Sequence, residues 1–137
     1  MSTDKLLYEK LTYKIRGVIF KVYNELGFGH KENVYQKALE HALRKNNVKF
    51  DKEKALDVIY DGTKVGTYRP DFVIDGKILL ELKAVPFLAK AAETQLIYYL
   101  KGTNFKLGLL VNFGSKKLVI KRRIWTGYLR QSVINLR

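Results

Sequence analysis

The acidic and basic residues with the most suggestive spacing lie in one segment near the middle of the chain. Asp71 follows Pro70, and nine residues separate it from Glu81-Leu82-Lys83. Because side chains alternate along a strand, Glu81 and Lys83 would share one face. Two carboxylates beside an ammonium group suit a divalent cation and phosphodiester hydrolysis, since the ion lowers the pKa of a bound water. A surface hairpin with a Glu–Lys pair is the simpler alternative.

Whether Asp71 reaches the same face as Glu81 depends on the turn between the two strands. A two-residue loop would pair Asp71 with Leu80 and turn the two carboxylates to opposite faces. A three-residue loop over Ile74-Asp75-Gly76 would pair Asp71 with Leu79 and make the two acids diagonal neighbours on one face. We favour the longer loop because it leaves the other face wholly apolar. That face would carry Phe72, Ile74, Ile78, Leu80 and Leu82.

Composition restricts the available chemistry to carboxylates and hard cations. The chain has no cysteine and only two histidines, which excludes thiolate zinc sites, cysteine nucleophiles and multi-histidine metal sites. Lys and Arg number 26 against 13 Asp and Glu, so the net charge is +13, and no acidic residue follows Glu93. A field of one sign attracts polyanions, although a solubility surface would explain the same charge. A membrane surface is the weaker alternative, because the charges do not gather on one amphipathic helix.

The length of 137 residues predicts a single domain, residues 1–137. No stretch approaches the roughly 20 apolar residues of a membrane span, and the first residues lack the apolar run of a signal peptide. We therefore expect a cytoplasmic protein without a membrane partner.

Hydrophobic spacing predicts an α/β domain with a mixed sheet covered by helices. Helices are expected over residues 3–26, 31–46 and 87–101, with Pro86 opening the third helix and Gly102 ending it. Strands are expected over residues 48–51, 56–60, 64–74, 77–85, 107–113 and 117–125.

Taken together, these motifs resemble the PD-(D/E)XK nuclease superfamily. Pro70-Asp71 followed by Glu81-Leu82-Lys83 is similar to its signature, and Gly29-His30-Lys31-Glu32-Asn33-Val34-Tyr35 resembles the pattern that names the GxxExxY family within it. Residues 93–100 and 106–113 resemble the helix and strand that follow, so the likeness covers roughly residues 7–125. It implies a restriction-endonuclease-like αβββαβ core, with a mixed central sheet flanked by helices and an extra N-terminal helix.

The resemblance also implies roles for individual residues. Asp71 and Glu81 would be ligands of Mg²⁺ or Mn²⁺, with the Leu82 carbonyl as a further ligand. Lys83 would act on the nucleophilic water, and Glu32 would bind the ion directly or through water.

Two of the implied catalytic residues also have simpler explanations. Glu32 could be a first-turn acid favoured by the helix dipole, which is worth about 0.3–1 kcal/mol. Gln95, which the resemblance implies would support the lysine or the scissile phosphate, could equally be a polar residue at the edge of a helix.

The basic strand near the C-terminus is the candidate surface for a nucleic-acid backbone. Lys121 and Arg123 would share one face and Arg122 the other, so only some of them could contact one duplex. No base-reading motif is visible, so little direct sequence readout is expected. The candidate contacts are Lys116, Lys117, Lys121, Arg122 and Arg123.

We therefore expect a Mg²⁺- or Mn²⁺-dependent DNA nuclease that uses a metal-activated water. The alternative is a non-catalytic nucleic-acid-binding module, or a subunit of a DNA repair or defence complex, with a nuclease-like fold. A homodimer would help so small a domain to cover a duplex or a junction.

Overall fold

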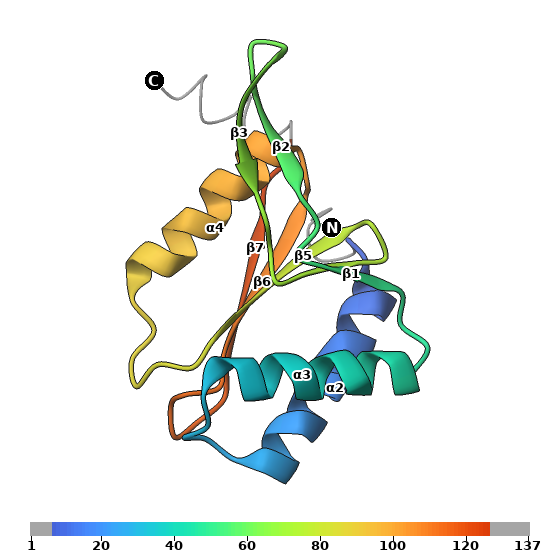
Figure 1. Cartoon of the computed structure of the whole chain (residues 1–137), viewed down its shortest axis with the longest axis vertical. Helices are drawn as coiled ribbons and strands as arrows, with labels where there is room; N and C mark the ends of the chain where they lie inside the picture. Colours follow the sequence, from blue (N-terminus) through green and yellow to red (C-terminus); the bar gives the residue numbers. More distant parts are fainter. Residues whose placement is uncertain (1–6, 127–137) are drawn as a thin grey trace.

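In the computed structural model, which describes residues 7–126, a five-stranded sheet lies between two layers (Figure 1). Helices α2 (Glu9–Leu26) and α3 (Glu32–Lys45) form one layer, and α4 (Lys90–Thr103) with the β2–β3 hairpin forms the other. The strands are β1 (Phe50–Lys52), β2 (Leu56–Tyr60), β3 (Thr63–Tyr68), β4 (Phe72–Ile74), β5 (Ile78–Lys83), β6 (Leu107–Asn112) and β7 (Val119–Ile124).

The main sheet has the order β1-β4-β5-β6-β7. Strands β5 and β6 are parallel, and the other neighbouring pairs are antiparallel. The expected mixed sheet flanked by helices is therefore confirmed. The first expected helix is confirmed over Glu9–Leu26, while residues 3–6 lie outside the described part of the chain. None of the helices within residues 7–126 has the length and apolar character that a bilayer crossing requires.

Each face of the sheet has its own apolar core, because alternate residues of a strand point to opposite sides. Leu80 of β5 packs in the core that contains Ile15 of α2 and Leu39 of α3. Leu79, its neighbour, packs in the second core with Leu96 of α4. The face predicted to be wholly apolar is confirmed, since Phe72, Ile74, Ile78, Leu80 and Leu82 are all buried in the first core.

The strand expected over residues 64–74 is wrong, because the structure divides it into two strands that belong to different sheets. Strand β3 pairs with β2 in the hairpin that lies outside the main sheet, whereas β4 pairs with β1 and β5 inside it. The break falls at the buried Pro70, which has no N–H to donate to a ladder. It leaves Asp71 directly before β4, at the point where the sheet begins.

The turn between β4 and β5 has three residues, but it lies one residue later than expected and consists of Asp75, Gly76 and Lys77. Asp75 and Gly76 both have positive φ, 51° and 66°, and the Lys77 N–H donates to the Ile74 carbonyl at 2.9 Å. The ladder therefore starts with Ile74 opposite Ile78.

This turn shifts the expected register by two residues, which leaves every side chain on its expected face. Phe72 lies opposite Leu80, and one step further along the hairpin Asp71 meets Glu81 directly rather than diagonally. The Asp71 N–H donates to Glu81 Oε1 at 3.0 Å. The two acids are thus closer than the sequence indicated.

Helix α4 begins and ends later than expected. Residues 86–89 form a loop instead of the first helical turn, and Ala89 is still extended with φ −69° and ψ 141°. Gly102 does not end the helix; it lies against Val58, and a Cβ there would come within 2.8 Å of Val58 Cγ1. Asn104 ends the helix in the left-handed conformation at φ 62°.

The loops that follow β5 and β6 are held together by the fully buried side chain of Asn112. Its amide oxygen accepts the N–H groups of Val85 and Gly114, both at 3.0 Å, and its Nδ2 donates to the Val85 carbonyl at 2.9 Å. Gly114 permits this approach, because a Cβ there would lie 2.2 Å from the Val85 nitrogen. Asn112 therefore fixes the segment that directly follows Lys83.

Asn112→Ala should lower the free energy of unfolding by about 2–4 kcal/mol, because partly buried backbone groups of Val85 and Gly114 lose their hydrogen-bond partners. Urea unfolding followed by circular dichroism measures the change. Asn24→Ala, at an exposed position of α2, is the matched control and should stay within about 0.5 kcal/mol. A similar small effect for Asn112→Ala would contradict its role in holding the loops.

Candidate active site

Three acidic side chains and one lysine gather where β5 ends. Glu81 and Lys83 belong to β5, Asp71 directly precedes β4, and Glu32 is the first residue of α3. Burial, followed by the charge of Asp71, raises the pKa of both Glu32 and Glu81, and the Lys83 ammonium opposes each rise. The four residues that the sequence assigned to one site therefore lie within electrostatic reach of one another.

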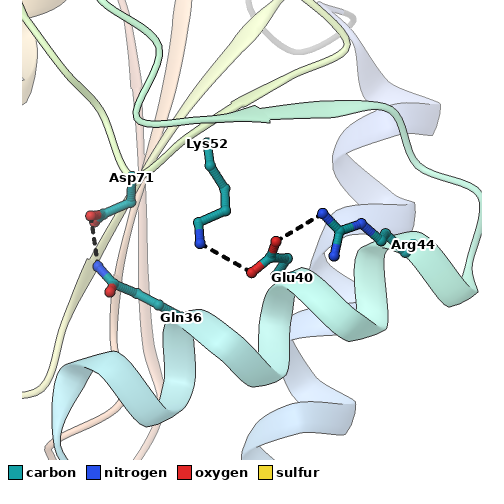
Figure 2. Close-up of polar contacts among 5 residues, drawn as sticks. All are labelled: Gln36, Glu40, Arg44, Lys52 and Asp71. Atoms are coloured by element: carbon teal, nitrogen blue, oxygen red, sulfur yellow. Dashed lines mark hydrogen bonds and ion pairs between the residues drawn. The ribbon is translucent and has the colours of Figure 1, made fainter.

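Both carboxylate oxygens of Asp71 accept hydrogen bonds. Gln36 Nε2 of α3 donates to Oδ1 at 2.8 Å, as Figure 2 shows, and the Leu82 N–H donates to Oδ2 at 2.7 Å. Burial still raises the pKa of Asp71, although these two bonds and Lys83 oppose it. Sequence reasoning missed Gln36, but it lies four residues after Glu32 and so on the same helix face.

Glu81 is the most strongly perturbed carboxyl group of the site. Burial raises its pKa from 4.5 to about 7, and the nearby Asp71 charge adds to the rise. The Tyr68 hydroxyl, the Asp71 N–H and the Lys83 ammonium oppose it only in part. A cation placed between the two carboxylates would relieve both the burial cost and the repulsion.

Tyr68, at the end of β3, is a second site residue that the sequence analysis missed. Its ring is buried and stacks on Tyr99 of α4, with the ring centroids 3.5 Å apart. Its hydroxyl is next to Glu81, yet makes no hydrogen bond of regular geometry within residues 7–126. Burial, then the Glu81 charge, raises the pKa of this phenol. No local signal in the sequence pointed to a tyrosine from a separate hairpin.

Gln95 does not contact the acids directly. It is exposed on α4, and its Nε2 donates to Tyr99 Oη at 3.3 Å. Because Tyr99 stacks on Tyr68, two aromatic rings separate Gln95 from Glu81.

Lys116 and Lys117 are exposed in the loop between β6 and β7. Because β5 and β6 are parallel, this loop lies at the same end of the sheet as Lys83. Tyr23 of α2 anchors the loop by donating its hydroxyl to the Lys116 carbonyl at 2.5 Å. The two lysines are thus presented by an anchored backbone at the end of the sheet that carries Lys83.

The three basic residues of β7 are half-buried and differ in their surroundings. Lys121 and Arg123 lie opposite Leu110 and Gly108 of β6, so they share the face covered by α4, and Arg122 lies on the other face. Arg123 forms an ion pair with Glu93 of α4. This pair ties the edge strand to the helix.

The donor set at the end of β5 fits a small divalent cation. Mg²⁺ keeps several waters and needs only one or two protein carboxylates, which Asp71 and Glu81 can supply. No three acidic or histidine side chains within residues 7–126 converge tightly enough to form a ready three-ligand site, so Glu32 fits a contact through water. The Leu82 carbonyl oxygen is a further candidate metal ligand. In an extended residue the carbonyl points to the same side as the N–H, and the Leu82 N–H points toward Asp71.

Two solved structures are similar to this chain. The structure of SSO0001 aligns with 98% of this chain and 71% of its own, at 21% identity and a TM-score of 0.53, which indicates a shared fold. An alkaline exonuclease, LHK-Exo from Laribacter hongkongensis, aligns over 70% of this chain and 57% of its own, at 13% identity and a TM-score of 0.41. A search of curated proteins gave no significant match.

The family comparison is more extensive. The sequence profile of the PD-(D/E)XK nuclease superfamily matches residues 9–124. This range runs from the first residue of α2 to the last residue of β7 and includes both helical layers and every strand of the main sheet. The chain therefore belongs to the PD-(D/E)XK nuclease superfamily.

Proposed function

We propose that this chain is a divalent-metal-dependent nuclease that hydrolyses the phosphodiester bonds of DNA with a metal-activated water. The observation that supports this most is the direct approach of Asp71 to Glu81, in a partly buried place with Lys83 beside them. Two acids in that position are costly to the fold unless a cation joins them.

Asp71 and Glu81 hold the cation, with the Leu82 carbonyl and, through water, Glu32. A Mg²⁺ or Mn²⁺ ion at this place would polarise the scissile phosphate and lower the pKa of a coordinated water. The chain itself supplies the positioning. Gln36 and the Leu82 N–H fix both oxygens of Asp71, and the Asp71 N–H fixes Glu81.

Lys83 supplies a positive charge that can move to the reacting atoms. Its backbone carbonyl accepts the Phe113 N–H, but its side-chain ammonium makes no hydrogen bond or ion pair with other residues in the range 7–126. Its ammonium can therefore orient the attacking water and stabilise charge that develops on the phosphate. Gln95, exposed on α4 and bonded to Tyr99, is available to a phosphate oxygen or to Lys83 once DNA is bound.

We assign the chain to the GxxExxY branch of the superfamily, because each of the three residues that define the motif, Gly29, Glu32 and Tyr35, has a separate physical task. Gly29 has a φ of 105°, which side chains rarely tolerate. Glu32 lies in the first turn of α3, where the charge of Asp71 raises its pKa. Tyr35 Oη donates to the Gly27 carbonyl at 2.6 Å, and its ring stacks on Phe113 at 4.5 Å.

DNA suits the charge of the chain as a polyanionic substrate. The net charge is +13, and Lys116 and Lys117 are exposed at the end of the sheet that carries the acids. Contacts of this kind bind the backbone without reading the sequence. The substrate preference is therefore expected to come from the shape of the DNA.

The protein should nick or degrade plasmid DNA with Mg²⁺ or Mn²⁺ and should lose this activity in EDTA. Lys83→Ala should lower the cleavage rate by roughly 100-fold or more, which is typical for loss of one electrostatic contact in a transition state. Its melting temperature should remain close to that of the wild type. Lys77→Ala, an exposed lysine of the β4–β5 turn, is the matched control and should cleave normally.

Binding of DNA without cleavage, across metals and DNA structures, would contradict the nuclease proposal and favour a non-catalytic binding module. Wild-type cleavage that persists in EDTA would contradict the metal dependence.

Without divalent ions, the free energy of unfolding should fall as the pH rises from about 5 to 8. Glu81 loses its proton near pH 4.5 when unfolded and near pH 7 when folded, so the folded state binds more protons in this window and is less stable at its upper end. Glu81→Gln should reduce the slope and stabilise the metal-free protein at pH 8 by about 2 kcal/mol. Urea titrations at several pH values measure both effects.

Addition of Mg²⁺ at pH 8 should stabilise the wild type and have little effect on Glu81→Gln. Glu25→Gln, at an exposed position of α2, is the control and should keep the wild-type slope. An unchanged slope in Glu81→Gln would show that Glu81 is not the source of the pH dependence.

A further inference from the structure

Two phenylalanines are exposed on loops beside the candidate active site. Phe87 is 89% exposed in the loop between β5 and α4, four residues after Lys83. Phe28 is 54% exposed in the loop between α2 and α3, four residues before Glu32. Each aromatic ring thus lies close in sequence to a residue of the site.

The backbone on both sides of Phe87 is fixed. Val85 is bonded through its N–H and its carbonyl to the buried amide of Asn112. Leu88 packs against the core on the α4 side of the sheet. Because Val85, two residues before Phe87, and Leu88, the residue after it, are both held in place, the fold itself exposes the Phe87 ring.

The backbone around Phe28 is held in a similar way by Tyr35. The Tyr35 hydroxyl donates to the Gly27 carbonyl at 2.6 Å and accepts the His30 N–H at 3.3 Å. The Tyr35 ring stacks on Phe113, which directly follows Asn112. Both phenylalanine loops are therefore fastened to the same end of β6, and Figure 1 shows them at the lower end of the molecule.

We infer that Phe28 and Phe87 form an aromatic rim on which unpaired bases of the substrate stack, so that the enzyme prefers DNA with single-stranded nucleotides next to the scissile phosphate. This inference rests on the proposed nuclease function. Each base has an aromatic face, and stacking on a protein ring stabilises binding of a single strand regardless of its sequence. Inside a continuous duplex these faces are covered by neighbouring bases, so the rim would find no partner there.

The charge around the rim favours a nucleic acid over an apolar partner. Lys116 and Lys117 are exposed in the loop that Gly114 brings against Val85, so cationic side chains accompany the aromatic rings. A single strand of DNA could place a backbone phosphate against the lysines and stack a base on each phenylalanine ring at the same time.

Fluorescence anisotropy in EDTA tests the rim without cleavage, using a labelled oligothymidylate and a blunt-ended duplex of equal length. Phe28→Ala/Phe87→Ala should weaken binding of the single strand by about 5- to 100-fold and that of the duplex by less than twofold. Phe87→Trp should retain the affinity of the wild type, whereas Phe87→Leu, apolar but without an aromatic ring, should lose it. Tyr60→Ala is the control, since Tyr60 is 73% exposed on the hairpin at the opposite end of the molecule.

The outcomes separate the rim from the nuclease proposal. Equal loss of single-strand and duplex binding, no loss in the double variant, or full retention by Phe87→Leu would each overturn the rim and leave the nuclease proposal standing. Failure of the wild-type protein to bind either DNA in EDTA would overturn the rim, whereas the nuclease proposal is decided separately by cleavage with Mg²⁺.

Discussion

The pairing of β4 with β5 brings Asp71 and Glu81 into direct proximity, and the core opposes a slip of one residue between the two strands. A slip of one residue would part the two acids, but it would also turn the apolar set of Phe72 and Leu80 out of the first core. Because burial of that set stabilises the fold, the repulsion between the carboxylates is maintained by the hydrophobic core. Burial of the apolar residues of the sheet therefore offsets the unfavourable free energy of the repulsion between the two carboxylates.

The polar groups around the acids orient the carboxylates without neutralising them. Gln36 and two backbone N–H groups occupy specific oxygens, and the Lys83 ammonium lowers the pKa of each acid, yet the pKa of Asp71 and of Glu81 stays raised. Orientation without full neutralisation is what a cation site needs, because the ligands are ready and the charge is still missing. The neighbouring Tyr68 hydroxyl is likewise held in place while its hydrogen-bonding capacity is unused, because it is buried and has no regular hydrogen bond.

The sequence was sufficient for local periodicity and insufficient for contacts between distant elements. The shared face of Asp71 and Glu81 followed from the period of two along a strand and from the need for one apolar face. The register was wrong by two residues, because left-handed Asp75 and Gly76 moved the start of the ladder to Ile78. The break between β3 and β4 was missed, because apolar and polar residues continue to alternate across Pro70 as they would in a single strand.

Three further contacts needed three-dimensional information. Gln36 reaches Asp71 from α3, Tyr68 reaches Glu81 from the separate hairpin, and Arg123 of β7 pairs with Glu93 of α4. Each joins elements far apart in the sequence, so no spacing rule could identify the partner. Gln36 came nearest to being predictable, since it follows Glu32 by one helical turn.

Anomalous diffraction from a crystal soaked in Mn²⁺ tests the central claim most directly, because it locates the ion rather than its consequences. The account predicts one anomalous peak within coordination distance of a carboxylate oxygen of Asp71 and of Glu81, with the Leu82 carbonyl facing it. A peak elsewhere, or no peak with both side chains ordered, would contradict the claim that these two acids hold a divalent cation.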